Sequence, residues 1–129
     1  MRRLLIAVCV LLLAVPVMAQ VRSSFLLEAA TTAVAGSPTR PSAAFLTLQA
    51  YGETTAGSGA TVILIEVTNI EAPATATSVD WVQACSISLT LGTTRTSDSC
   101  TLAAPWRLIR AKVSSISGTN ASVNVRIGG

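Results

Sequence analysis

Apolar and polar residues alternate with a period of two through most of the chain beyond residue 19. The alternation is clearest in residues 44–51, 85–91, 109–113 and 123–127, and it is typical of strands with one buried face. Residues 61–68 have an apolar centre on both faces, as expected for a central strand. No window beyond residue 19 has apolar residues at helical spacing. The pattern therefore predicts an all-β domain.

Turn-forming residues separate these predicted strands, as in residues 52–59 and 118–120. Short strands between regular turns predict a single antiparallel β-sandwich of about six to eight strands. We expect residues 20–43 to form an N-terminal strand and loop segment, and residues 44–129 to form the sandwich core. The length that remains after residue 19 suits one small domain with one core.

The first 19 residues have the layout of a cleaved secretory signal helix. Arg2 and Arg3 form a positive start, residues 4–15 are apolar without interruption, and the segment ends at the small residue Ala19. A membrane-spanning helix needs about 20 apolar residues, and this run is shorter; a retained membrane anchor is the alternative. We therefore expect a signal peptide at 1–19 and an exported protein, periplasmic or extracellular, that meets a membrane only transiently.

Cleavage also changes the charge of the protein. The whole chain has nine Lys and Arg against six Asp and Glu, a net charge of +3. Loss of Arg2 and Arg3 leaves seven basic residues and a net charge of +1. These residues are too scattered to follow a phosphate backbone, so no nucleic-acid partner is expected. They are Arg22, Arg40, Arg95, Arg107, Arg110, Lys112 and Arg126.

Residues that carry catalysis or bind metals are scarce. The chain has no histidine, which removes the usual general base and the commonest metal ligand. Only Cys85 and Cys100 follow the signal, too few for a structural zinc site. The carboxylates are spread singly, and a hydrolytic pair would require two of them to meet in the fold. We therefore expect no enzymatic activity, no cofactor and no metal. The carboxylates are Glu28, Glu53, Glu66, Glu71, Asp80 and Asp98.

Cys85 and Cys100 occupy mirrored positions around a candidate turn. Gly92-Thr93 suits a two-residue hairpin turn, because glycine supplies the positive φ needed at the first position. Pairing across this turn places the cysteines opposite each other, and an oxidising compartment favours a disulfide worth roughly 3 kcal/mol. An ideal turn puts them at a widely spaced pair, so we expect a bulge near residues 97–99. Two unpaired buried thiols are the alternative.

The last two predicted strands form a second hairpin if Gly118-Thr119-Asn120 is its loop. Val113 then lies opposite Val125, and the apolar faces match without a shift of register. The other face gathers three positive charges, which predicts a contact surface; the alternative is that the charges only keep the sheet soluble. This polar face consists of Arg110, Lys112, Asn124 and Arg126.

Trp81 and Trp106 each stand just ahead of an apolar strand. Large rings at these positions suit the closed ends of a sandwich, where they add apolar area to the core. Exposed rings would instead offer platforms for stacking on a sugar. We expect the core position, and ligand contact is the alternative.

The second half of the chain resembles a known family. Residues 104–113 read APWRLIRAKV and residues 116–125 read ISGTNASVNV, similar to the end of small β-sandwich proteins encoded among tailed-phage structural genes. In that family a tryptophan precedes a strand, a glycine-containing turn follows, and a valine-rich strand ends the chain. Residues 49–52, 57–62 and 86–91 resemble the middle of the same proteins. The resemblance extends from about Phe25 to the C-terminus.

This resemblance implies a non-enzymatic structural or assembly protein, associated with virions. Such a protein would form homo-oligomers, or bind other structural proteins, through exposed strand edges. The signal peptide and the cysteine pair depart from the family pattern and fit a module adapted to an oxidising space. The alternative is an exported binding module that holds a glycan or an envelope protein with its loops. The loop residues for this function are Tyr51, Glu53, Trp81 and Asn120.

Overall fold

The computed structural model describes residues 23–73, 78–103 and 105–128, and the predicted signal peptide lies outside them. The described residues form seven strands and one short 3-10 helix. These are β1 (Ser24–Ala30), β2 (Phe45–Glu53), β3 (Ala56–Thr68), η1 (Ser78–Asp80), β4 (Val82–Leu91), β5 (Thr96–Ala103), β6 (Leu108–Thr119) and β7 (Ser122–Gly128). No helix in the described ranges is long and apolar enough to cross a membrane.

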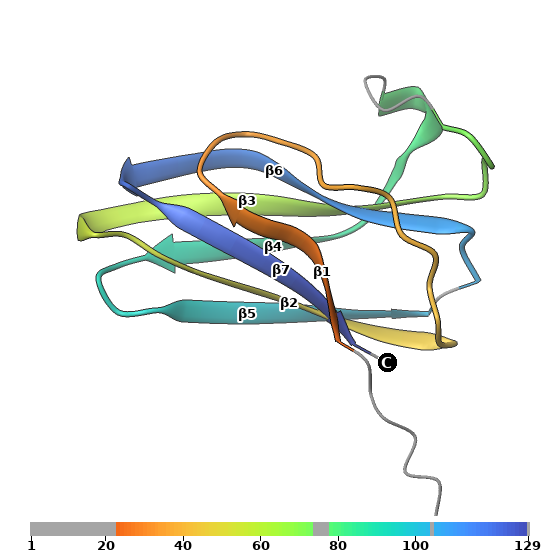
Figure 1. The fold of residues 1–129 in the computed structure, drawn as a ribbon, viewed down its shortest axis with the longest axis horizontal. Coiled ribbons are helices and arrows are strands. Elements are labelled where there is room, and N and C mark those ends of the chain that lie inside the picture. Colours follow the sequence, from red (N-terminus) through yellow and green to blue (C-terminus); the bar gives the residue numbers. More distant parts are fainter. Residues whose placement is uncertain (1–22, 74–77, 104, 129) are drawn as a thin grey trace, which may run out of the picture.

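The strands form two antiparallel sheets, which confirms the predicted β-sandwich (Figure 1). The four-stranded sheet has the order β1-β7-β2-β5, and the three-stranded sheet has the order β4-β3-β6. Every paired strand runs antiparallel to its neighbour. β3 is the central strand of its sheet, as the apolar centre of residues 61–68 predicts.

The core lies between the sheets and is built from one face of each strand. Leu46, Leu48 and Ala50 of β2 are buried, in agreement with the predicted alternation, and Ile63 and Ile65 of β3 are fully buried. Burial of one such aliphatic side chain contributes about 1.5–3 kcal/mol. The further buried apolar residues are Leu26, Leu27, Ala30, Val67, Ile87, Leu89, Leu91, Ile109, Ala111, Val113, Ala121, Val123, Val125 and Ile127.

The predicted C-terminal hairpin is wrong, because β6 and β7 belong to different sheets. Gly118 (φ 115°) and Asn120 (φ 48°) form the turn between them. At Gly118 a Cβ atom would come within 2.7 Å of the Thr54 Cγ2 atom, so the turn also needs a residue without a side chain. Val113 and Val125 are both buried, but they belong to opposite walls of the core. A period of two indicates which face of a strand is buried. It does not determine which other strand pairs with that strand.

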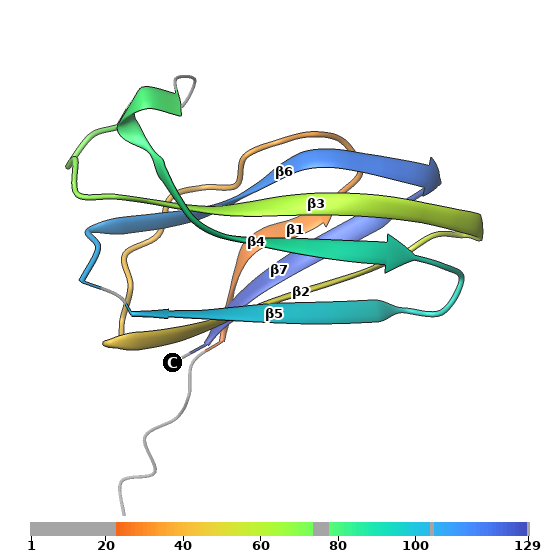
Figure 2. The ribbon, with the colours of Figure 1, turned by 180° about the vertical axis from the view of Figure 1, so that it is seen from behind.

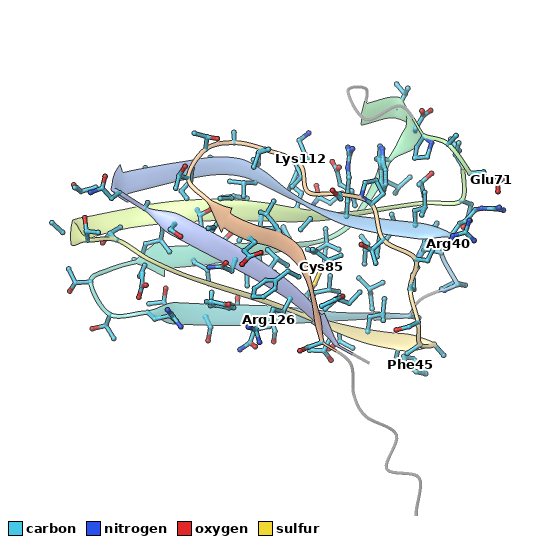
Figure 3. All side chains as sticks on the ribbon, viewed as in Figure 1. Arg40, Phe45, Glu71, Cys85, Lys112 and Arg126 are labelled. Carbon is cyan, nitrogen blue, oxygen red and sulfur yellow. A yellow bond between two sulfur atoms is a disulfide. The ribbon has the colours of Figure 1, made fainter. Side chains whose placement is uncertain are left out.

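The predicted disulfide between Cys85 and Cys100 is present, but the hairpin around it is not (Figure 3). β4 and β5 are edge strands of different sheets, so the bridge joins the two layers. The Cα atoms of the cysteines are 6.8 Å apart, farther than in either kind of antiparallel pair. β5 pairs with β2 from Thr96 to Ala103 without a shift of register, so the bulge expected near residues 97–99 is absent. The spacing between the sheets accommodates the bridge instead.

Several sheet edges in the described part of the chain are covered. Along β6, the Gly36 N–H donates to the Ala111 carbonyl at 2.8 Å, and Thr39 exchanges two backbone hydrogen bonds with Ile109 at 2.8 and 2.9 Å. In β1, Ala29 has a φ of 46° and its N–H donates to the Asn124 side chain of the neighbouring strand β7 at 2.9 Å, so the β1–β7 ladder is irregular there. β4 and β5 lie close to each other at one side of the sandwich (Figure 2). Covered edges resist strand addition, so the sheet faces are the more accessible contact surfaces.

Candidate binding face

The outer face of the four-stranded sheet carries an aromatic ring among polar side chains. In β2 the even-numbered residues are buried and the odd-numbered ones are accessible, so Gln49 and Tyr51 point outward. Strand register then determines their neighbours. Tyr51 is paired with Ser97 of β5, and Gln49 is paired with Arg126 of β7.

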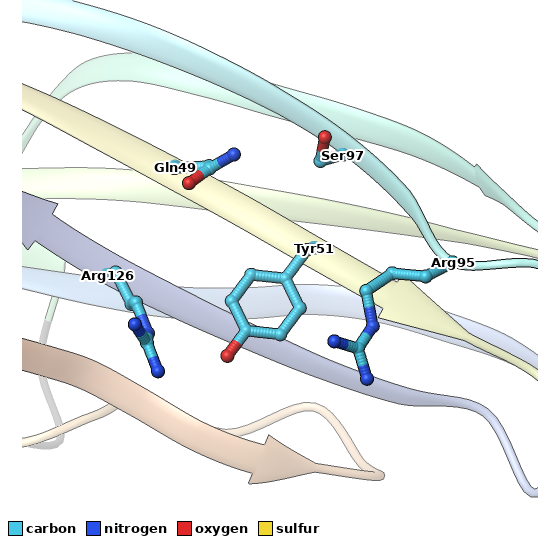
Figure 4. Close-up of a pocket in the computed structure, with 5 residues that line it drawn as sticks. All are labelled: Gln49, Tyr51, Arg95, Ser97 and Arg126. Carbon is cyan, nitrogen blue, oxygen red and sulfur yellow. The ribbon is translucent and has the colours of Figure 1, made fainter.

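Two arginines flank Tyr51 from different elements. Arg95 comes from the loop that leads into β5, and its guanidinium carbon lies 5.1 Å from the centre of the Tyr51 ring. The guanidinium carbon of Arg126 lies 5.9 Å from the same ring and 4.3 Å from the ring of Phe25. In Figure 4 the Tyr51 hydroxyl lies between the two guanidinium groups, on the same side of β2. Cation–π contact of this kind holds a guanidinium against a ring while its N–H edge stays accessible.

The charge balance of this face is positive. Arg95 Nη2 lies 3.3 Å from Glu53 Oε1, but the two side chains are 61% and 46% exposed, and an exposed pair contributes about 0–1 kcal/mol. A ligand can therefore displace this pair at little cost. No ion pair connects Arg126 to a carboxylate of the described residues.

A shallow hollow of about 410 Å³ opens between these side chains (Figure 4). We call its lining the Tyr51 face, which consists of Gln49, Tyr51, Arg95, Ser97 and Arg126. A second hollow of about 260 Å³ shares Gln49 and Arg126 with the first, so the two hollows adjoin. The second hollow is further lined by Ser23, Thr47, Ile127 and Gly128.

The predicted surface of Arg110, Lys112 and Arg126 does not exist as one patch. Arg110 and Lys112 lie on β6, and Arg126 lies on β7 in the other sheet. Arg110 is also only 2% exposed, so it offers no contact surface. Because the turn at residues 118–120 crosses between sheets, the positive charges separate. Arg126 alone of the three joins the Tyr51 face.

Arg110 belongs instead to a buried ion pair on the outer side of the three-stranded sheet. Its cross-strand partner in β3 is Glu66, and the Arg110 Nε donates to Glu66 Oε2 at 2.7 Å. Lys112 Nζ lies 3.8 Å from the other carboxylate oxygen. The ring of Trp81 lies 4.0 Å from the Arg110 guanidinium carbon and is itself 5% exposed. Trp81 therefore covers an ion pair and is not an exposed sugar platform.

The other predicted loop residues have different positions. Tyr51 and Glu53 were predicted as loop residues but lie in strand β2, where Glu53 stands beside the Tyr51 face as the partner of Arg95. Asn120 is a turn residue that donates to the Thr55 hydroxyl at 3.1 Å. Trp106 is partly buried and packs against the core cluster, as expected for a ring at the end of a sandwich.

Sequence reasoning missed Gln49, Arg95 and Ser97 as site residues. The outward position of Gln49 followed from its alternation with Leu48 and Ala50, so that signal was present. Arg95 follows the Gly92-Thr93 turn. The direction of its side chain depends on the crossing of the chain from β4 in one sheet to β5 in the other. No pattern in the sequence specified that crossing.

The chemistry of the Tyr51 face is recognition by hydrogen bonds and charge. It combines two guanidinium groups, a phenol, an amide and a hydroxyl on a rigid sheet. Among the described residues, no group of three or more His, Cys, Asp or Glu could hold a metal ion. Comparison of the chain with protein-family models, curated proteins and solved structures found no match.

Proposed function

We propose that this protein is a non-enzymatic, exported binding module that holds its partner on the Tyr51 face. The observation that carries the proposal is the Tyr51 ring flanked by two arginines over an open hollow. Tyrosine and arginine, with tryptophan, are the residues enriched at the energetic centres of interfaces. Because neighbouring strands hold most of these side chains, the face needs little reorganisation to bind.

The carboxylates support a non-enzymatic function. Glu53, Glu66 and Glu71 each pair with a different arginine, at separate places in the fold. Glycoside hydrolysis by carboxylates needs two of them at one site. The absence of histidine from the whole sequence removes the commonest alternative base.

Export is supported by the signal-like sequence of residues 1–19 and by the disulfide. Structural disulfides persist in oxidising compartments and are rare in the cytosol. The bridge joins the sheets close to Ser97, three residues before Cys100 on β5. An exported binding face stabilised in this way stays folded where thiols are oxidised.

The binding proposal predicts that cell-surface attachment depends on Tyr51 and Arg126. The test measures binding of labelled protein, residues 20–129, to intact cells of the organism that encodes it. We expect the double variant Tyr51→Ala, Arg126→Ser to bind at least about tenfold more weakly, because hot-spot truncations cost about 2 kcal/mol or more. Arg40→Ser, which changes an exposed arginine outside the face, is the matched control. Equal binding by the double variant and the wild type, or no wild-type binding, contradicts the proposal.

Assembly, the function implied by the resemblance to phage structural proteins, is the second candidate. Phe45 at the start of β2 is 71% exposed, and Val82 at the start of β4 is 59% exposed. Phe45 pairs with Ala103, beyond Cys100 on β5, whereas Val82 precedes Cys85 on β4. Both apolar side chains therefore lie beyond the disulfide toward the same end of the sandwich. Contact with another subunit at this end would remove both side chains from water.

Assembly through this end predicts that Phe45→Ser with Val82→Ser yields a protein that stays monomeric at concentrations where the wild type associates. Loss of exposed apolar area removes the driving force, about 25 cal/mol per Å² of apolar surface buried. Sedimentation velocity over a concentration series measures the effect. Thr93→Ala, an exposed residue in the β4–β5 connection at the opposite end, is the control. A wild type that remains monomeric throughout would rule out self-assembly by this route.

A further inference from the structure

The orientation of Arg126 indicates the charge of the ligand. Its guanidinium stacks on Phe25 at 4.3 Å and approaches Tyr51 at 5.9 Å, so the rings limit its freedom on the sheet. Stacking uses the face of the guanidinium plane and leaves the N–H edge for a partner. No carboxylate in the described ranges forms an ion pair with this edge. The planar fork matches a carboxylate, which accepts two parallel hydrogen bonds from it.

Arg95 adds a second cation on the other side of Tyr51. Among the described residues, Glu53 is the one carboxylate in an ion pair with this face, so the face retains an excess of one positive charge. The Tyr51 hydroxyl lies between the two guanidinium groups (Figure 4) and can donate a further hydrogen bond to an anion. Together these groups favour a ligand that carries a carboxylate over a neutral one.

The neutral side chains indicate what carries the carboxylate. Gln49 and Ser97 line the same hollow, and an amide and a hydroxyl can both donate to and accept from sugar hydroxyls. A phosphate-rich polymer would require a longer basic track than two arginines. The adjoining hollow is lined by further polar residues, Ser23 and Thr47, so hydrogen-bonding groups are also present beside the first hollow.

We propose that the Tyr51 face binds an acidic saccharide, with the sugar carboxylate between Arg95 and Arg126 and the ring hydroxyls at Gln49 and Ser97. The inference rests on the proposed binding function and specifies its ligand class. An acidic peptide shares the carboxylate but lacks the adjacent ring hydroxyls, which makes it the competing outcome in the test.

The experiment titrates folded wild-type protein, residues 20–129, with trigalacturonate and sialyllactose as acidic probes. The corresponding neutral probes are trigalacturonate esterified with methanol at all of its carboxylates, and lactose; a tetraglutamate peptide tests the competing class. Calorimetry gives affinities, and amide chemical shifts locate the binding site. We expect at least one acidic saccharide to bind roughly tenfold more tightly than its neutral counterpart, because a charge-assisted bidentate contact is lost in the latter. Binding should weaken as salt is raised, with shift changes centred on β2, β5 and β7.

Substitutions of Arg126 distinguish the contribution of its planar guanidinium group from the contribution of its positive charge. Arg126→Gln should lower affinity for the acidic saccharide roughly tenfold, and Arg126→Lys should restore only part of it, because lysine keeps the charge without the planar fork. Arg40→Gln should bind as the wild type does. The inference is overturned if neither acidic saccharide binds, if the neutral probes bind equally well, or if tetraglutamate binds as tightly as the sugars. In any of those cases, attachment to cells that still depends on Tyr51 and Arg126 excludes only this ligand class. The proposed binding function is then still supported.

Discussion

Replacement of Arg110 by alanine is expected to lower the free energy of unfolding by about 3–5 kcal/mol. The side chains of Arg110 and Glu66 are only 3% and 7% exposed and lie 2.7 Å apart. Removal of the guanidinium leaves Glu66 buried, with Lys112 at 3.8 Å as the remaining cation. The Trp81 ring also loses the group that it covers. Urea denaturation followed by tryptophan fluorescence measures the loss.

A double variant separates the penalty of a lone charge from the contribution of the pair. Arg110→Met with Glu66→Leu removes both charges and keeps much of the volume, so it should recover most of the stability lost in Arg110→Ala. Arg40→Ala removes an exposed arginine and should stay within about 0.5 kcal/mol of the wild type. If Arg110→Ala is as stable as Arg40→Ala, the pair is not buried in solution as described.

Replacement of Cys85 and Cys100 by serine is expected to lower the free energy of unfolding by about 3 kcal/mol. The bridge spans a sequence separation of 15 residues, and opening it restores conformational freedom to the unfolded chain. Total stability of a domain this size is about 5–15 kcal/mol, so the loss is a large fraction. Denaturation midpoints of oxidised wild type and the double serine variant give the difference.

The bridge should also protect β5 locally. β5 has one ladder neighbour, β2, and is otherwise joined to the sandwich by the disulfide and the contacts of β4. We expect amide hydrogen exchange in the serine variant to rise more in β5 than in β7, which has neighbours on both sides. Reduction of the wild type should add two hydrogen atoms to its mass. Two reactive thiols in unreduced protein purified from an oxidising compartment would contradict the bridge.

The sequence predicted which residues form strands and which faces are buried, because both follow from local periodicity. The alternation in β2 identified Leu46, Leu48 and Ala50 as core, and their burial confirms it. The mirrored positions of Cys85 and Cys100 also predicted the disulfide. That prediction was right although the hairpin that it assumed was wrong. Two strands joined by a short loop lie near each other, whether they pair within one sheet or face each other across two sheets.

Tertiary structure alone decided how those strands combine, and therefore where the charges lie. A strand with one apolar face is buried equally well beside its chain neighbour or opposite it, so periodicity left the sheet of β6 and β7 undetermined. The chain passes from one sheet to the other between β6 and β7. Arg110 therefore lies under Trp81 with Glu66, and Arg126 lies on the outer face with Tyr51. By itself the sequence determined the strands and their buried sides. The ion pair and the Tyr51 face required the packing of two sheets, because their members come from elements far apart in the chain.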